Sequence, residues 1–339
     1  MVLILTEADV ELLANKTDWL VGIDVNEAVF REESLQHTLC PQRQIIDTMN
    51  EAATEKTMTT YFKYASVKGL GIGTKVVSVV PGNARLNKPT VPATVLLIDP
   101  VDGSSLALIG GTYLTGYRTA AGSAVAARYL APKDSSVLSV FGAGLQARCH
   151  IEALLAVMKG ITVINIHNRT VATAVALVDS LRLKYSNVRF VVVSAEEAVS
   201  SIVSESDIIV AATNSSKPLF DGRWVKPNSM VIAVGSSRPD SRELDSATVC
   251  SSTATIIVDD PGSCLVSGDI HSPLQEGVIT QGDLVRLSSV VAAKGLPAGT
   301  TKKSIIVYKS AGTAIQDIGT GKMFYDLAIK SNTGVKVDL

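Results

Sequence analysis

Residues 135–147 read SSVLSVFGAGLQA, and this stretch decides the fold of the chain. It begins as an apolar strand and passes through a GxGxxA motif (Gly142, Gly144, Ala147) into a helix-forming segment. The first glycine permits a tight turn, the second removes a side chain where backbone must approach a pyrophosphate, and the alanine lets the helix pack against the strand. Because the helix N-terminus also offers free N–H groups to phosphates, the stretch predicts a dinucleotide-binding site.

Downstream of this motif, apolar strands alternate with helical segments. Such alternation is typical of right-handed βαβ units, which build a parallel sheet covered by helices on both faces. The predicted fold class is therefore α/β, with a Rossmann-type doubly wound parallel sheet. Strands are expected at 161–167, 188–193, 207–213, 230–235 and 255–260, and helices at 145–160, 171–185 and 195–203.

Upstream of the motif the pattern changes and predicts a smaller α+β domain. Residues 1–35 are expected to be helical, with a start at Thr6 and an apolar face that carries Leu12, Leu13 and Leu20. Residues 42–107 are rich in β-branched and aromatic residues broken by glycine and proline, which predicts a mostly antiparallel sheet with a turn at 99–104. Further helices are expected at 119–130 and, with a tail, at 315–339.

Composition limits the classes of function. The 339 residues suit about two domains, and the net charge of -1 gives no overall attraction for nucleic acid or anionic membranes. No apolar run is long enough to span a bilayer, and the N-terminus lacks the basic start of a secretory signal, so we expect a cytoplasmic protein. The four cysteines and four histidines are scattered, which predicts reduced thiols and no metal site.

The end of the second predicted strand bears on the choice of cofactor. NAD enzymes usually place an acidic residue there, on the ribose hydroxyls. This chain has Asn168, Arg169 and Thr170 after His167. The arginine can meet a 2′-phosphate and its two neighbours can donate hydrogen bonds, so the sequence favours NADPH, with NADP preferred over NAD. The alternative interpretation is that Arg169 is only a solvated residue at a helix start.

Three further basic residues stand beside apolar sequence: Arg43, Lys75 and Arg118. A charge in apolar surroundings is costly unless it is paired. One interpretation is a pocket for an anionic carboxylate substrate. The other is the usual solvated residue at the edge of an element, and the sequence pattern alone leaves both open.

Several stretches together resemble the ornithine cyclodeaminase/mu-crystallin family. The matches follow the family's order and include PQRQII (41–46), GTKVVSV (73–79), TGYRTAA (115–121), FGAGLQA (141–147), HNRT (167–170), GSSRPDSREL (235–244) and KSAGTAIQD (309–317). The resemblance implies two domains. Residues 1–118, completed by 315–339, would bind substrate and dimerise, and residues 119–314 would form the NADP-binding Rossmann domain. Members are generally homodimers built by the sheets of the substrate domain.

The resemblance also implies roles for individual residues. Arg43 and Arg118 match arginines that hold the substrate carboxylate or approach the nicotinamide. Lys75 matches a lysine beside the reacting centre, which could carry a proton or polarise the imine, and Asp317 matches an acidic position near the same end of the site. Positions that match cofactor contacts are Ala143, Leu145, Gln146, Asn168, Arg169 and Thr170, with Thr213, Asn214, Val234 and Ser310 lining the nicotinamide half.

One departure from the family pattern matters for the reaction. True ornithine cyclodeaminases carry an aspartate two residues after the glycine that ends the AVG strand, and here that position is Ser237. Asp240 lies three residues further along and would need a different backbone path. The GxSRPD form looks like mu-crystallin and the reductase members instead.

The predicted function is therefore that of an NADPH-dependent reductase of small α-imino carboxylates in amino-acid metabolism. Such an enzyme is a ketimine or imine reductase, or an amino-acid dehydrogenase in the reverse direction. Two alternatives stay open: an amino-acid cyclodeaminase that releases ammonia from ornithine or a related diamino acid, and an NADPH-dependent binder of a small ligand without turnover. The expected partners are a small amino- or imino-acid substrate and a second copy of the chain.

Overall fold

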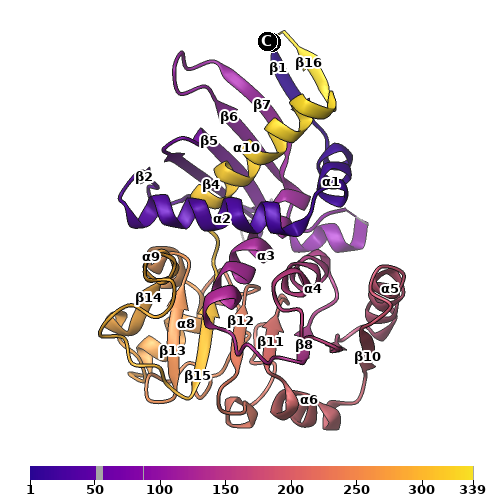
Figure 1. The fold of residues 1–339 in the computed structure, drawn as a ribbon, viewed down its shortest axis with the longest axis vertical. Helices are drawn as coiled ribbons and strands as arrows, with labels where there is room; N and C mark the ends of the chain where they lie inside the picture. Colours follow the sequence, from indigo (N-terminus) through magenta and orange to yellow (C-terminus); the bar gives the residue numbers. More distant parts are fainter. Residues whose placement is uncertain (51–55, 87, 339) are drawn as a thin grey trace. The chain divides into compact units, whose positions relative to one another are not determined.

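The computed structural model describes residues 1–50, 56–86 and 88–338. It divides into two compact units, which Figure 1 shows as a ribbon. The first unit comprises Met1–Arg118 and Thr313–Leu339, and the second unit is Thr119–Gly312. Among the described residues, no helix combines the length and the apolarity needed to cross a membrane.

The second unit is built on a parallel sheet with the strand order β10-β9-β8-β11-β12-β15-β13-β14 (Figure 1). The chain starts at β8, adds strands on one side and then returns to add the rest on the other, as in a doubly wound dinucleotide-binding sheet. This confirms the predicted α/β fold class. The strands are β8 (Val137–Phe141), β9 (Val163–His167), β10 (Arg189–Val193), β11 (Ile208–Ala211), β12 (Met230–Ala233), β13 (Ala254–Val258), β14 (Leu284–Arg286) and β15 (Ile305–Lys309).

The central strands of this sheet are buried on both faces. Every residue of β11, β12, β13 and β15 is buried, which is why these strands read as continuous apolar runs rather than as alternating patterns. Neither β14 nor β15 was among the strands expected from the sequence. The helices of this unit are α4 (Leu145–Val157), α5 (Val171–Arg182), α6 (Val199–Glu205), α7 (Pro261–Cys264), α8 (Gly268–Gln275) and α9 (Leu287–Ala293), with short 3-10 turns η2 (Glu196–Ala198), η3 (Gly222–Trp224) and η4 (Gln281–Asp283).

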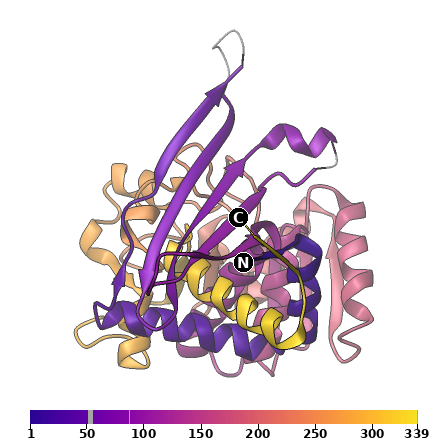
Figure 2. The ribbon, with the colours of Figure 1, turned by 90° about the horizontal axis from the view of Figure 1, so that it is seen from above.

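The first unit holds a mostly antiparallel sheet, as predicted, in the order β16-β1-β7-β6-β5-β4-β2, with β3 also paired to β4. Helix α10 lies across β4, β5 and β6 and beside α2, and Figure 2 shows both helices on one face of the sheet. The strands are β1 (Val2–Leu5), β2 (Thr38–Leu39), β3 (Gln44–Met49), β4 (Lys56–Val67), β5 (Gly71–Val79), β6 (Ala93–Ile98), β7 (Ser105–Gly110) and β16 (Val335–Val337); the helices are α1 (Glu7–Lys16), α2 (Trp19–Ser34) and α10 (Ala314–Ser331), with the 3-10 turn η1 (Pro81–Leu86). Helix α3 (Gly111–Leu130) begins in the first unit, and its residues from Thr119 onward belong to the second.

The two ends of the chain differ from the prediction. Val2–Leu5 was expected to be helical but is strand β1, which pairs in parallel with β7 and antiparallel with β16. The expected C-terminal tail contains β16. Both partners of β1 are remote in sequence, so the short apolar run VLIL carries no local signal that separates strand from helix.

Helix α1 begins after Thr6 as predicted, because the Thr6 side chain accepts from the backbone N–H of Asp9 in a capping box. Its buried face differs from the prediction. Leu13 is buried, but Leu12 is 45% exposed. Leu20, which lies in α2, is 37% exposed. The buried positions of α1 are Val10, Leu13 and Ala14.

Helix α3 starts at Gly111 rather than at Thr119, and the prediction was wrong here. The carboxylate of Glu7 accepts from the backbone N–H groups of Thr112 (2.8 Å) and Tyr113 (3.0 Å), and it caps the start of the helix from a distant part of the chain. Arg118 was predicted at a helix entrance and lies instead within α3.

Candidate functional site

The carboxyl edge of the parallel sheet in the second unit gathers most of the predicted cofactor residues. Backbone hydrogen bonds join consecutive strand ends there, from Gly142 to His167, from Val234 to Ala211 and from Ser310 to Ala233. In doubly wound sheets, ligands bind at this edge where the strand order reverses. Directly after β8, β9, β12 and β15 come Gly142, Asn168, Val234 and Ser310, and Thr213 and Asn214 are the second and third residues after β11.

The glycine turn after β8 fits a bound pyrophosphate. Gly142 has φ +110°, and a Cβ there would lie 2.4 Å from the carbonyl oxygen of Ala212. Both the backbone conformation and the lack of space therefore require glycine at this position. A Cβ at Gly144 would meet nothing within 4 Å. Gly144 is the N-cap of the 13-residue helix α4, and no side chain of the N-cap residue caps the first N–H groups of the helix. Ala143 is buried, whereas Leu145 and Gln146 are half-buried.

The residues after β9 present an exposed cation. Arg169 and Thr170 are exposed, and the side-chain amide of half-buried Asn168 donates to the carbonyl of Thr170 (2.8 Å). Because β9 is hydrogen-bonded to β8, these residues follow the strand next to the glycine turn. The stretch 167–170 holds no carboxylate that would repel a 2′-phosphate.

Two buried carboxylates that the sequence analysis did not single out organise this edge, and the first is Glu243. It accepts from the backbone N–H (2.6 Å) and hydroxyl (2.8 Å) of Thr213 and from the backbone N–H of Gly235 (2.6 Å). It therefore ties the loop after β11 to the loop after β12. Burial raises the pKa of Glu243 to about 7, the charge of Asp269 adds to the rise, and Lys309 opposes it.

The second organising carboxylate is Asp259, at the end of β13. It accepts from the Ser310 hydroxyl (2.7 Å) and from the backbone N–H of Gly312 (2.7 Å), and so fixes the loop after β15. The signal in the sequence was an aspartate directly after an apolar strand. The fully buried Lys309, the last residue of β15, pairs with Asp269 (3.0 Å).

In the first unit, three predicted residues from three separate elements meet. Lys75 of β5 donates to the carboxylate of Asp317 in α10 at 2.6 Å, and both side chains are fully buried. Nε of Arg118, in α3, lies 2.9 Å from the same carboxylate oxygen. Lys75 also donates to the hydroxyl of Thr115 (3.2 Å). We call Lys75, Arg118 and Asp317 the buried triad.

Arg43 lies just before β3 and is half-buried. Its guanidinium carbon is 5.1 Å from the ring centroid of Tyr61, within the range of a cation–π interaction. It is not part of the buried triad, but its positive charge reaches Lys75 and lowers the pKa of that residue.

The surroundings of the triad set its protonation. Burial lowers the pKa of Lys75 to about 8, with Asp317 opposing the change and Arg118 adding to it. Burial acts to raise the pKa of Asp317, but Lys75 and Arg118 outweigh it, and the net shift is downward. At neutral pH the carboxylate is therefore ionised, and Lys75 holds a proton that it can release within the physiological range.

Sequence reasoning missed another lysine of this unit, Lys63. It lies directly opposite Lys75 in the register of β4 and β5 and is only 6% exposed. Tyr61, Lys63, Ala65 and Val67 alternate along β4 and all four are buried, so Lys63 stands on the covered face of this strand.

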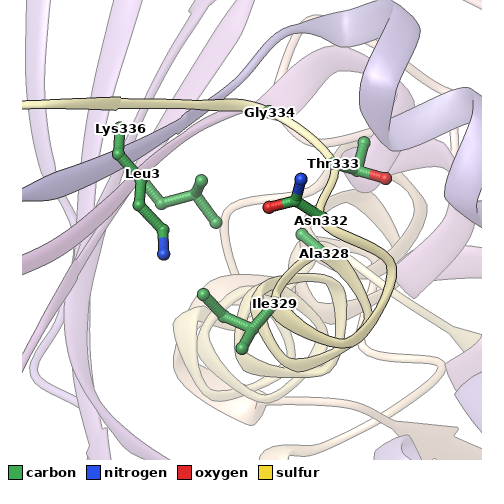
Figure 3. A pocket seen from close by; sticks show the side chains of 7 residues that line it. All are labelled: Leu3, Ala328, Ile329, Asn332, Thr333, Gly334 and Lys336. Carbon is green, nitrogen blue, oxygen red and sulfur yellow. The ribbon is translucent and has the colours of Figure 1, made fainter.

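A hollow of about 240 Å³ lies elsewhere in the first unit, between β1, β16 and the end of α10 (Figure 3). Leu3 and Ile329 line its apolar side, and Lys336 is its one ionisable lining residue. It contains none of the predicted site residues, and we assign it no function.

The Ser237 region also has a defined geometry. The preceding residue, Ser236, is buried and donates to the carbonyl of Ser241 at 2.5 Å. Asp240 is exposed and pairs with Arg238 at 3.1 Å. A surface ion pair therefore engages the carboxylate that stands nearest in sequence to the position of the cyclodeaminase aspartate.

Comparison with known proteins places these features in a family. The model of the ornithine cyclodeaminase/mu-crystallin family matches residues 4–332. An uncharacterized cyclodeaminase of Dictyostelium discoideum is 38% identical over 370 residues, covering 99% of each chain. The solved structure of Thermococcus litoralis Δ1-pyrroline-2-carboxylate reductase, in complex with NADH and L-proline, is 31% identical with a TM-score of 0.89 and covers 99% of this chain and 100% of that chain.

A second solved structure, an archaeal alanine dehydrogenase dimer with bound NAD, is 30% identical with a TM-score of 0.86 and covers 99% of each chain. The family match spans nearly the whole sequence, and the resemblance inferred from the motifs is confirmed. The chain belongs to the ornithine cyclodeaminase/mu-crystallin family.

Proposed function

We propose that this protein is an NADPH-dependent reductase of small α-imino carboxylates. The observation that carries the proposal is the buried triad, in which a lysine with a pKa of about 8 is held at 2.6 Å from a carboxylate and beside an arginine. Reduction of an α-imino carboxylate requires a proton at nitrogen, and a cation that binds the carboxylate positions the substrate for it. The triad supplies both kinds of group in one place.

Each residue of the buried triad, together with Arg43, has its own role in this reduction. A bound reduced nicotinamide supplies the hydride that adds to the imine carbon. Lys75 gives its proton to the imine nitrogen, so that the C=N bond becomes an amine. Asp317 keeps Lys75 charged and in place, as their ion pair indicates. Arg118 and Arg43 orient the substrate carboxylate.

The second unit holds the cofactor in this proposal. The glycine turn and the N-terminus of α4 take the pyrophosphate, and Arg169 takes the 2′-phosphate that separates NADPH from NADH. Thr213, Asn214, Val234 and Ser310 line the nicotinamide half, with Glu243 and Asp259 fixing two of these loops. Solved relatives carry NADH or NAD, which supports a pyridine nucleotide but leaves the NADP preference to experiment.

The proposal favours reduction over cyclodeamination. The Dictyostelium relative is described as a cyclodeaminase. In this chain, however, the position of the cyclodeaminase aspartate is Ser237, and Asp240 is engaged by Arg238. The chemistry that handles a second amine therefore lacks its carboxylate.

The test is NADPH oxidation with pyrroline-2-carboxylate, piperideine-2-carboxylate and pyruvate plus methylamine. We expect turnover with at least one of them, and loss of turnover in Lys75→Ala while NADPH binding, followed by fluorescence, is retained. Normal turnover by Lys75→Ala would reject the role of the lysine. Release of ammonia from ornithine without net change of NADP would instead establish a cyclodeaminase.

A further inference from the structure

We propose that Glu243 is a positioning residue for the dinucleotide, and that only its ionised carboxylate holds the loops after β11 and β12 in the arrangement that binds the nicotinamide half. Cofactor binding then releases a proton from this side chain to the solvent. The inference rests on the proposed function and concerns the regulation of the same site. Glu243 acts through the loops that contain Thr213 and Gly235, rather than by contact with the cofactor.

The carboxylate of Glu243 is fully buried and accepts hydrogen bonds from both loops. Its Oε1 accepts from the backbone N–H (2.6 Å) and the hydroxyl (2.8 Å) of Thr213. Its Oε2 accepts from the backbone N–H groups of Gly235 (2.6 Å) and Ser236 (3.3 Å). The loops approach closely here, since a Cβ at Gly235 would lie 2.6 Å from Oε1 and would clash with the carbonyl oxygen of Thr213. One side chain therefore sets the spacing of two loops at the edge of the sheet where doubly wound folds bind their ligands.

A protonated Glu243 cannot keep this set of hydrogen bonds. A proton on Oε2 would point at the backbone N–H groups of Gly235 and Ser236, which are donors and cannot accept it. A proton on Oε1 would have to be donated to the hydroxyl of Thr213, which would then stop donating to Glu243. That hydroxyl already accepts from the backbone N–H of Ser215 (3.2 Å). Either site of protonation therefore removes at least one hydrogen bond between the carboxyl group and the loops.

Charged groups on two other elements act on Glu243 and oppose one another. Asp269, in α8, accepts from the backbone N–H of Glu243 (2.7 Å) and disfavours ionisation of its carboxyl group. Lys309, at the end of β15, favours ionisation and pairs with Asp269. Beside Lys309, the thiol of Cys264 donates to Asp259 (3.3 Å). Burial and Asp269 raise the pKa of Glu243 to about 7 against the effect of Lys309, so the carboxyl group changes its charge near neutral pH.

The experiment follows NADPH binding by nicotinamide fluorescence between about pH 6 and pH 8. The ionised fraction of Glu243 falls from about 90% to about 10% over this range, so the dissociation constant of the wild type should rise about tenfold as the pH is lowered. Glu243→Gln has nearly the same shape but stays neutral. Because the 2′-phosphate of NADPH also titrates near pH 6, the variant is compared with the wild type at each pH. The ratio of the two dissociation constants should fall from about ten at pH 8 to about one at pH 6.

Calorimetry in buffers of different ionisation enthalpy measures the proton release directly. Near pH 7 the wild type should release about half a proton more per NADPH bound than Glu243→Gln does. A merely structural role for Glu243 predicts no such difference, even if the variant is less stable.

The matched control is Asp207→Asn, at the amino edge of the same sheet. Asp207 also accepts from backbone N–H groups, those of Ser136 (2.7 Å) and Val137 (2.9 Å). Burial acts to raise the pKa of Asp207, but Lys226 and these N–H groups outweigh it, and the net shift is downward. The carboxylate therefore stays ionised over the range of the experiment. Asp207→Asn should show the pH dependence and the proton release of the wild type.

The outcomes are distinguishable. One pH dependence and one proton release shared by the wild type and Glu243→Gln overturn the inference and leave the reductase standing. The expected pH dependence without reduction of any imine supports the inference and overturns the reductase. Absence of NADPH and NADH binding at every pH overturns both. If Glu243→Gln does not fold, Glu243→Asp decides, because a carboxylate at another distance from the loops should shift the midpoint of the pH dependence, and an unmoved midpoint overturns the inference.

Discussion

Lys75 is fully buried, and burial is the main reason that its pKa falls from 10.5 to about 8. A proton donor acts only while it is protonated, so kcat/KM for imine reduction should decrease as the pH rises through about 8. The pH–rate profile of the wild type, measured with a substrate whose own protonation is constant over the range, tests this. A profile that stays level through this pH contradicts the assignment.

The same shift has a consequence for stability. Because the folded-state pKa of Lys75 lies below its value of 10.5 in the unfolded chain, the unfolded chain binds more protons between about 8 and 10.5. The lysine therefore lowers the free energy of unfolding below about pH 8, and this cost is removed as the pH rises through that window.

Arg169 is exposed and stands where the chain leaves β9. Arg169→Ala should raise the dissociation constant of NADPH by roughly ten- to a hundredfold, the value of one charge-assisted contact, and change that of NADH little. Titration by nicotinamide fluorescence measures both constants. Arg189→Ala, at the exposed start of β10, is the matched control. An unchanged preference for NADPH would mean that Arg169 is only a solvated surface residue.

At the scale of elements, the two glycines in the turn between β8 and α4 should have different roles, one in the stability of the fold and the other in cofactor binding. Gly142→Ala places a side chain at φ +110° and 2.4 Å from a carbonyl oxygen, so it should lower the free energy of unfolding by about 1–3 kcal/mol or more. Gly144→Ala meets open space at φ -89° and should change stability by less than about 0.5 kcal/mol, while it weakens NADPH binding. Urea denaturation and fluorescence titration of both variants test this pair. Equal loss of stability in both would contradict it.

The elements also show which parts of the fold were predictable. The strands and helices that flank Gly142 follow from local apolar runs and helix patterns, and they were predicted. The start of α3 was not, because Glu7 caps it from far away in sequence. Strand β1 was missed for the same reason, since both of its pairing partners are remote.

The residues of the candidate site also fall into those that the local sequence predicted and those that it did not. Gly142 and Arg169 could be predicted from the local sequence, because each lies within two residues of the end of a strand. Lys75 and Arg118 were singled out as basic residues beside apolar sequence and Asp317 by the family resemblance, and the folded first unit brings the three together. Glu243 was not predicted, because its importance comes from two loops that meet only in the folded sheet.

At the scale of the whole molecule, strand β3 stands out. All of its residues are exposed in the single chain, and Ile45, Ile46 and Met49 are 51%, 56% and 45% exposed. Apolar groups at a sheet edge favour association. We therefore expect a homodimer that covers this part of the first unit. One solved relative is described as a dimer.

Ile46→Glu should shift the protein toward a monomer, because a charge would have to be buried at that contact. Sedimentation equilibrium measures the association constant. Leu183→Glu, which changes an apolar residue that is 92% exposed in the second unit, is the control and should not affect association. A monomeric wild type at micromolar concentration would rule the homodimer out.

Asp317 belongs to the part of the first unit that follows the second unit along the chain. During synthesis, the ribosome therefore makes β5 and Lys75 well before the carboxylate that stabilises them, and the whole second unit is translated in between. Domains generally fold as units as they emerge. The second unit has all its strands by Gly312, whereas the first must wait for α10. A product that terminates before α10 would lack both the carboxylate of Asp317 and the helix that packs on β5, so the Lys75–Asp317 ion pair forms only in a chain that has been translated as far as this helix.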